Sequence, residues 1–77
     1  MTSTVASAQA PAVEQLAHPL PALATFELAA YRRQLEHAIE FYERTGPAAA
    51  LLAGLRENLA EAIAEQDDRV RIAARNA

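Results

Sequence analysis

Apolar side chains recur at helical spacing in two long stretches of this 77-residue chain. At about 100° per residue they fall within one sector of each helix, and most charged residues fall outside it. The first sector holds Leu28, Tyr31, Leu35, Ala38, Ile39 and Tyr42. The second holds Leu52, Leu55, Leu59, Ala62, Ile63, Val70 and Ala73. Several of these positions repeat at seven residues, as in coiled coils. The pattern therefore predicts two amphipathic helices.

The two stretches meet at Thr45-Gly46-Pro47. Gly is common just past the C-terminus of a helix, because it takes a positive φ without a Cβ penalty. Pro is favoured at the first position of a helix, where its missing N–H costs nothing. The sequence predicts helices over residues 22–45 and about 47–75, joined by almost no loop and therefore antiparallel. The expected fold is an all-α, two-helix hairpin that resembles a coiled coil.

The antiparallel arrangement implies a register, that is, which residues of the two helices face each other. If Leu35 faces Leu59, then Leu28 lies by Gln66, and the flanking positions bring Glu27 near Arg69 and Glu36 near Arg56. A polar residue such as Gln66 in a seam often fixes register or oligomeric state. Tyr31 or a symmetry-related Gln66 is its expected partner, and a ligand contact is the alternative. The predicted seam consists of Leu28, Tyr31, Leu35, Ile39, Tyr42, Leu52, Leu55, Leu59, Ile63, Gln66 and Val70.

Residues 1–21 have a different composition. They contain Pro11, Pro19 and Pro21, a single charged residue and too little apolar mass to fold alone. We expect a flexible Ala/Pro-rich arm followed by the hairpin in residues 22–77. Whether residues 11–18 form about two turns of helix, with Val13 and Leu16 on one side, is left open.

Two helices cannot surround their own seam, so we expect the hairpin to dimerise into a four-helix bundle. Whether the subunits run parallel or antiparallel is left open. A second face of the first helix carries Phe26, Ala30, Arg33, His37 and Phe41, with Arg44 beyond. Soluble monomers seldom expose contiguous apolar patches. This face is therefore the expected partner interface, either with a second copy or with a different protein; scattered exposure is the remaining alternative.

The second helix also carries small residues, Ala49, Ala53, Ala60 and Ala64, beside Gly54. Gly inside a helix costs about 1 kcal/mol relative to Ala, which suggests a close helix approach at Gly54. Simple Ala-rich helix propensity is the other interpretation.

Composition narrows the function classes. The net charge is −3, which disfavours binding to a nucleic-acid backbone. There is no Cys, and all seven basic residues are Arg, a usage typical of a GC-rich bacterial genome. No signal peptide or membrane-spanning run is recognisable, so we expect a cytoplasmic protein. His18 and His37 lack metal-ligand spacing, and no catalytic motif is present. We expect no enzyme activity, cofactor or metal.

The leading hypothesis is a small regulatory or protein–protein interaction module that acts as a homodimer. One alternative is a sensor of an anionic ligand, gripped by Arg32, Arg33, Arg44 and Arg56. Small anti-sigma factors share the hairpin shape, but their ligand-binding repeat has no match here; whether any small molecule binds is left open. Another alternative is an accessory or docking subunit of a larger enzyme.

Overall fold

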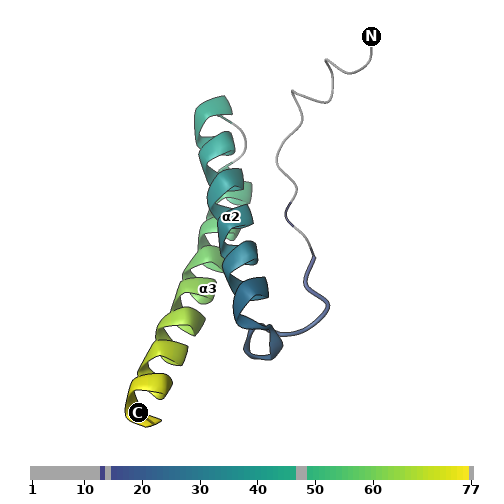
Figure 1. Cartoon of the computed structure of the whole chain (residues 1–77). Coiled ribbons are helices and arrows are strands. Elements are labelled where there is room, and N and C mark those ends of the chain that lie inside the picture. Colours follow the sequence, from purple (N-terminus) through teal and green to yellow (C-terminus); the bar gives the residue numbers. More distant parts are fainter. Residues whose placement is uncertain (1–12, 14, 47–48, 77) are drawn as a thin grey trace.

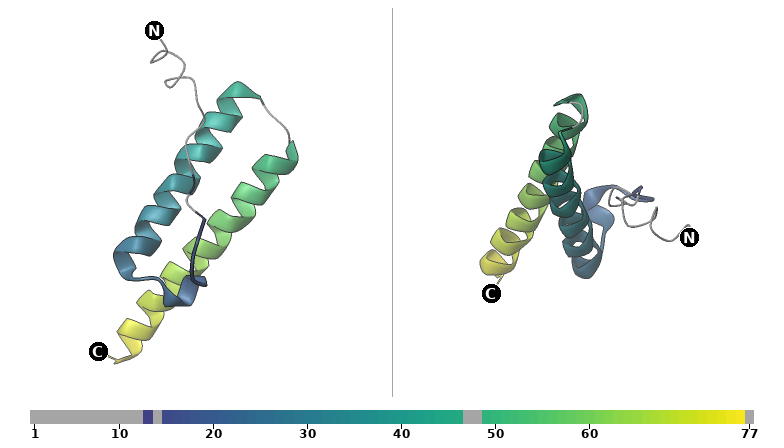
Figure 2. Two further views of the ribbon diagram at one scale, coloured as in Figure 1. Left: turned by 90° about the vertical axis from the view of Figure 1, so that its right-hand side faces the viewer. Right: turned by 90° about the horizontal axis from the view of Figure 1, so that it is seen from above.

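Two long helices dominate the computed structural model, which describes residues 13, 15–46 and 49–76. The described residues form a short 3₁₀ turn, η1 (Leu20–Ala22), and the α-helices α2 (Thr25–Thr45) and α3 (Ala49–Asn76), without any strand. The helices pack side by side and run antiparallel (Figure 1; Figure 2). The prediction of an all-α helical hairpin is confirmed.

Helix α2 begins at Thr25, three residues later than the sequence predicts. Pro21 belongs to η1, and Leu23 and Ala24 are extended, with ψ values of 142° and 158°. The Glu27 side chain turns back, and its Oε1 accepts a hydrogen bond of 2.7 Å from the Ala24 backbone N–H. This bond satisfies an amide that the helix leaves without a partner. It therefore favours a helix start after Ala24 over one at Ala22.

The far end of α2 closes as predicted at Gly46. This residue has φ 71° and ψ 43°, in the left-handed region, and its N–H donates to the carbonyl of Tyr42 at 3.0 Å. Only Gly takes that conformation without a Cβ penalty. The predicted helix start at Pro47 lies outside the described residues. The described part of α3 continues to Asn76, one residue beyond the predicted end.

The two glycines of the chain should respond oppositely to Ala. No atom lies within 4 Å of a Cβ built on either one, so steric contact within the described chain does not decide the outcome. At Gly46 the positive φ remains, so Gly46→Ala should lower the free energy of unfolding by about 1 kcal/mol. Gly54→Ala should raise it by about 1 kcal/mol through helix propensity. Chemical denaturation of both variants measures this, and equal shifts of the same sign would contradict it.

The open space around Gly54 also corrects an expectation. No described part of the chain approaches this residue closely, so within the described hairpin it does not mark a close contact between helices. The residue of α3 that is fully buried against α2 is instead Ala62, which is 0% exposed and belongs to the same cluster as Leu28 and Leu35.

The buried core is narrow and belongs mostly to α2. Leu28, Leu35, Ala38 and Ile39 of α2 are buried, and Ala62 is the only buried residue of α3. Leu23, just before α2, joins the cluster at 9% exposure. Tyr31, Leu55 and Leu59 pack against it and are only partly buried. The hairpin therefore leaves much of the apolar stripe of α3 incompletely covered.

The N-terminal segment supplies the remaining cover. We call residue 13 and residues 15–23 the strap; in Figure 2 it lies over the groove between α2 and α3. Val13, Leu16 and Leu20 pack against the core cluster. The expected arm without tertiary contacts is therefore wrong for these residues, and residues 15–18 are not helical. Residues 1–12 and 14 lie outside the described part of the chain, so the prediction of a flexible arm stays a prediction there.

The polar contacts between the helices differ from the predicted ones. Gln66 lines a hollow together with Leu28, the residue beside which the sequence argument placed it, but its Oε1 accepts a hydrogen bond of 2.7 Å from Nη1 of Arg32. The expected pairs Glu27–Arg69 and Glu36–Arg56 are wrong. Arg56 pairs with Glu43 at 2.6 Å, Arg69 with Glu65 at 2.9 Å, and Glu36 with Arg32 at 3.1 Å.

Helix α3 also extends beyond the start of α2, as Figure 1 shows at the C-terminal end. Val70 is 68% exposed and Ile72 is 47% exposed. Val70 lines a hollow with Thr25 and Leu28 of α2, so it lies at the exposed edge of the seam. The other predicted seam residues are buried or partly buried: Leu28, Tyr31, Leu35, Ile39, Tyr42, Leu52, Leu55, Leu59, Ile63 and Gln66.

Candidate functional site

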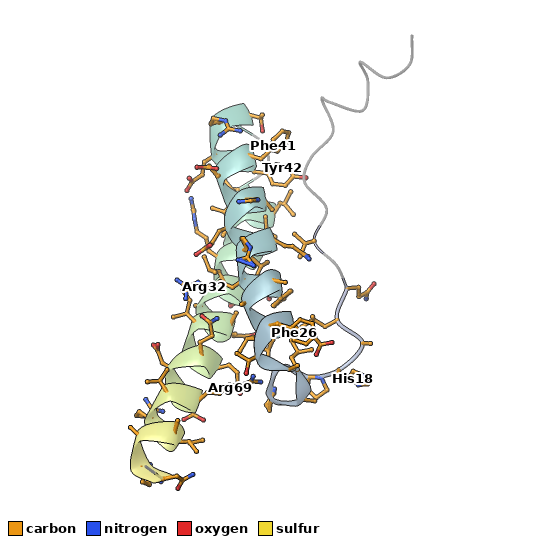
Figure 3. The ribbon with its side chains drawn as sticks, viewed as in Figure 1. His18, Phe26, Arg32, Phe41, Tyr42 and Arg69 are labelled. Atoms are coloured by element: carbon orange, nitrogen blue, oxygen red, sulfur yellow. The ribbon has the colours of Figure 1, made fainter. Side chains whose placement is uncertain are left out.

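The second face of α2 lies on the outside of the hairpin, as its sequence position suggested. Phe26 is 75% exposed, and Arg33 and His37 are exposed as well. Phe41 is partly buried, and its ring forms an edge-to-face contact with the Tyr42 ring at a centroid distance of 5.2 Å and an interplanar angle of 82°. The two phenylalanines lie near opposite ends of α2 (Figure 3). They do not form one continuous aromatic patch.

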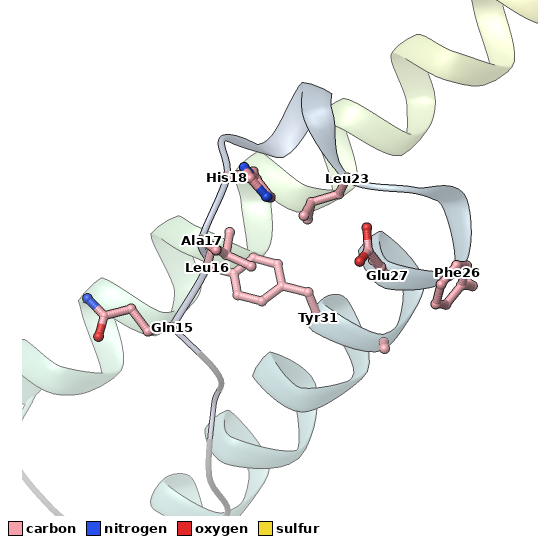
Figure 4. A pocket seen from close by; sticks show the side chains of 9 residues that line it. Gln15, Leu16, Ala17, His18, Leu23, Phe26, Glu27 and Tyr31 are labelled. Carbon is pink, nitrogen blue, oxygen red and sulfur yellow. The ribbon is translucent and has the colours of Figure 1, made fainter.

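A hollow of about 360 Å³ lies where the strap passes α2 (Figure 4). Tyr31 extends from α2 toward Leu16 and Ala17 of the strap, while Phe26 stands at the outer edge. The residues that line it are Gln15, Leu16, Ala17, His18, Leu23, Phe26, Glu27, Ala30 and Tyr31. Phe26 and Ala30 of the predicted partner interface therefore border the strap, whereas Arg33, His37 and Phe41 do not line this hollow.

Tyr31 has an altered acidity in this position. Its burial raises the pKa of the phenol above the ordinary value, and the negative charge of Glu61 on α3 raises it further. Both effects disfavour the charged phenolate. Tyr31 is not the partner of Gln66, contrary to one of the sequence expectations, since Arg32 occupies that role.

The pKa of Tyr31 should be measurable without interference. The chain has two tyrosines and neither Lys nor Cys, so Tyr42→Phe leaves one side chain that titrates above about pH 9, apart from arginine. The tyrosinate absorbance should then show a midpoint above about pH 10, and Glu61→Gln should lower it. A midpoint at or below pH 10 that ignores Glu61→Gln would contradict this.

The raised pKa of Tyr31 also makes the stability of the fold depend on pH. Because the folded pKa is raised, the contribution of Tyr31 to stability is complete below about pH 10. It is lost as the pH rises from there through the folded pKa.

Arg69 of α3 fastens the strap to the hairpin. Its Nη2 donates to the carbonyl oxygens of Leu20 at 3.1 Å and Leu23 at 2.7 Å, and its Nε donates to Glu65 at 2.9 Å. Its side chain is 26% exposed and that of Glu65 19%, and hydrogen bonds to a charged donor are stronger than neutral ones. In Figure 3 Arg69 lies at the lower end of the groove, beside η1. The sequence argument had placed it only near Glu27.

The groove between the helices therefore has two unlike sides. At about 100° per residue, Glu65 and Arg69 lie on one flank of Ala62, and this flank meets the strap. Gln66 and Arg56 lie on the other flank, where they reach Arg32 and Glu43 of α2. We call this second flank the open side. It carries the partly buried Leu52, Leu59 and Ile63 and the exposed Val70.

A second hollow, of about 370 Å³, lies at one end of the open side. Val70 and Gln66 of α3 and Thr25 and Leu28 of α2 line it, together with Asp67 and Arg69. Leu28 itself is only 1% exposed. The hollow therefore leads from solvent toward the core, next to the most exposed apolar side chain of α3.

The arginines proposed for an anionic ligand do not converge on either hollow. Arg32, Arg44 and Arg56 each lie within 4.0 Å of a carboxylate, from Glu36, Glu40 and Glu43 respectively. Arg33 is exposed. A ligand would have to displace these carboxylates, so the geometry does not favour the sensor hypothesis.

The two histidines, His18 and His37, are both exposed. The described residues hold no cluster of His, Cys, Asp or Glu that is arranged to bind a metal ion.

Within the same residues, neither helix is long and apolar enough to cross a membrane.

Comparisons with protein-family models, with curated protein sequences and with solved structures found no match to this chain.

Proposed function

We propose that this chain is a cytoplasmic, non-catalytic helical module for protein–protein interaction, with a regulatory role, and that it acts as a homodimer. The observation that supports this is the incomplete burial of α3. This helix has 28 residues and buries only Ala62, although it carries a long, largely apolar stripe. A helix in a globular protein gains most of its stability by packing such a stripe against another element.

A second copy is the simplest element to cover the stripe. Chains of this size bury too little surface to be very stable alone, and association is a common remedy. Pairing two hairpins gives a four-helix bundle, in which each helix contacts two neighbours. The bundle would present the strap and the second face of α2 on its outside.

The melting temperature of the protein tests this proposal. When folding requires association, stability rises with protein concentration by mass action. Circular dichroism should therefore show a melting temperature that increases over a hundredfold range of concentration. An unchanged melting temperature over that range would count against the homodimer.

Phe26 supports a second role, docking on a different protein. Its side chain is 75% exposed on the side of α2 away from the α3 contact, and aromatic residues of this kind often anchor an interface. In this role the chain would be an accessory subunit. Phe26→Asp should leave helicity and dimerisation unchanged and abolish binding to that partner. If Phe26→Asp instead dissociates the dimer, this face is the self-association surface.

A further inference from the structure

We infer that the open side of the hairpin is the surface on which two copies associate, with α3 of one copy packed antiparallel against α3 of the other. This inference rests on the proposed homodimer and assigns its interface. Its starting point is the asymmetry of the groove. The strap packs along one side and is held there by Arg69, whereas the other side has an apolar stripe that the described chain covers only in part.

The open side has the spacing of a helix-pairing surface. Its α3 residues alternate at intervals of four and three, which keeps them on one face of a helix and allows knobs-into-holes packing. We call this set the α3 stripe; it consists of Leu52, Arg56, Leu59, Ile63, Gln66 and Val70. Four of the six are apolar, and the polar pair separates them evenly.

The α3 stripe is also self-complementary. In a two-fold interface, if one residue contacts a second across the axis, the second contacts the first. Placing Leu59 opposite Ile63 of the second copy puts Leu52 opposite Val70 and Arg56 opposite Gln66. Apolar residues then meet apolar residues, and polar residues meet polar residues, along the whole stripe.

The hollow at one end of the α3 stripe fits the same pairing. The hollow of about 370 Å³ lies beside Val70 and is walled by Thr25 and Leu28. In the antiparallel register, Leu52 of the second copy arrives at this place and has room for its side chain. By symmetry each copy receives one leucine and donates one. The pairing would bury Val70, whose side chain is 68% exposed in the single chain.

Charged residues at the edge of the α3 stripe also favour this pairing. Asp67 follows Gln66 and also lines the hollow. In the proposed register it lies next to Arg56 of the second copy, whose side chain is 55% exposed and forms an ion pair with Glu43 within the hairpin. Such rim pairs contribute little energy and instead select register and orientation. They favour the proposed antiparallel register, because it brings Asp67 of one copy close to Arg56 of the other.

Two substitutions at neighbouring exposed positions test the surface. Val70 and Ile72 both lie in the last turns of α3 and are 68% and 47% exposed, so neither change should unfold the hairpin. Val70→Glu would bury a charge twice in each dimer and should raise the dissociation constant by at least about tenfold. Ile72→Glu lies on the flank away from the open side and should leave it unchanged. Equal effects, or a larger effect of Ile72→Glu, would overturn the inference.

Cysteine cross-linking tests the antiparallel register. Because the chain has no native Cys, Leu52→Cys and Val70→Cys can be prepared as separate proteins and oxidised alone or mixed. The mixture should form a disulfide-linked dimer, and each variant alone should form much less, because position 52 opposes position 70 of the other copy. A cross-link that forms equally well in each variant alone would overturn the antiparallel register.

The inference and the proposed function fail in different ways. If the wild-type chain has the mass of a monomer at every concentration, the homodimer itself is wrong. If it is a dimer that withstands Val70→Glu and dissociates with Phe26→Asp, the homodimer stands and the assigned surface is wrong.

Discussion

Replacement of Leu35 by Ala should lower the free energy of unfolding by about 3 kcal/mol. Leu35 is 0% exposed and forms the core cluster with Leu23, Leu28 and Ala62. Truncation removes buried methyl groups and leaves a cavity between the two helices, and both effects reduce stability. Denaturant unfolding at a fixed protein concentration measures the loss.

Leu51→Ala is the matched control for this prediction. It deletes the same atoms from a side chain that is 43% exposed on α3, so the loss should stay below about 1 kcal/mol. If both variants lose the same amount, the narrow core described above does not carry the stability of the hairpin.

Replacement of Arg69 by Met should release the strap. Met keeps an apolar stem of similar length but loses the hydrogen bonds to the Leu20 and Leu23 carbonyls and the ion pair with Glu65. Bonds from a charged donor contribute about 1.5–3 kcal/mol each, and partial exposure reduces this, so we expect a total loss of about 2 kcal/mol.

Hydrogen exchange shows whether that loss is local to the strap. The amides of Ala22 and Leu23 donate to the carbonyls of Pro19 and Leu20 within η1, and their exchange should accelerate in Arg69→Met. Exchange in the middle of α2 should change less. Arg71→Met is the control, because Arg71 pairs with Asp68 at a site where its side chain is 67% exposed. Unchanged exchange at Ala22 and Leu23 in Arg69→Met would show that Arg69 does not hold the strap.

The hairpin itself was predictable from local signals. Apolar periodicity defined both helices, and Gly46 marked the end of the first one, because a positive φ at a helix end selects Gly. The exposure of Phe26 was also predictable, since it lies on the face of α2 opposite Leu28 and Leu35. These features depend on residues close together in the chain.

The polar contacts between the helices were not predictable by the same means. Gln66 lines a hollow with Leu28, as the apolar stripe implies, but its hydrogen-bond donor is Arg32, one turn further along α2. The apolar pattern places the helices and does not assign partners to the long polar side chains that flank it. Val70 follows the stripe and lines the same hollow but is 68% exposed.

The strap was missed because its prolines and low charge resemble those of a disordered segment. A signal was nevertheless present: Val13, Leu16, Leu20 and Leu23 recur at intervals of three and four residues. Sequence reasoning connects that spacing with a helix, whereas here part of it belongs to extended chain and a 3₁₀ turn. The carbonyls of such chain have no regular partners, and Arg69 supplies them from a distant part of the sequence.

The mass of the protein in solution tests the central claim most directly. Light scattering coupled to size exclusion should give twice the chain mass of 8.3 kDa at micromolar concentration. It should give a value that falls toward 8.3 kDa on dilution and in Val70→Glu, but not in Ile72→Glu. A mass of 8.3 kDa at every concentration, with the helices fully formed, would contradict the account.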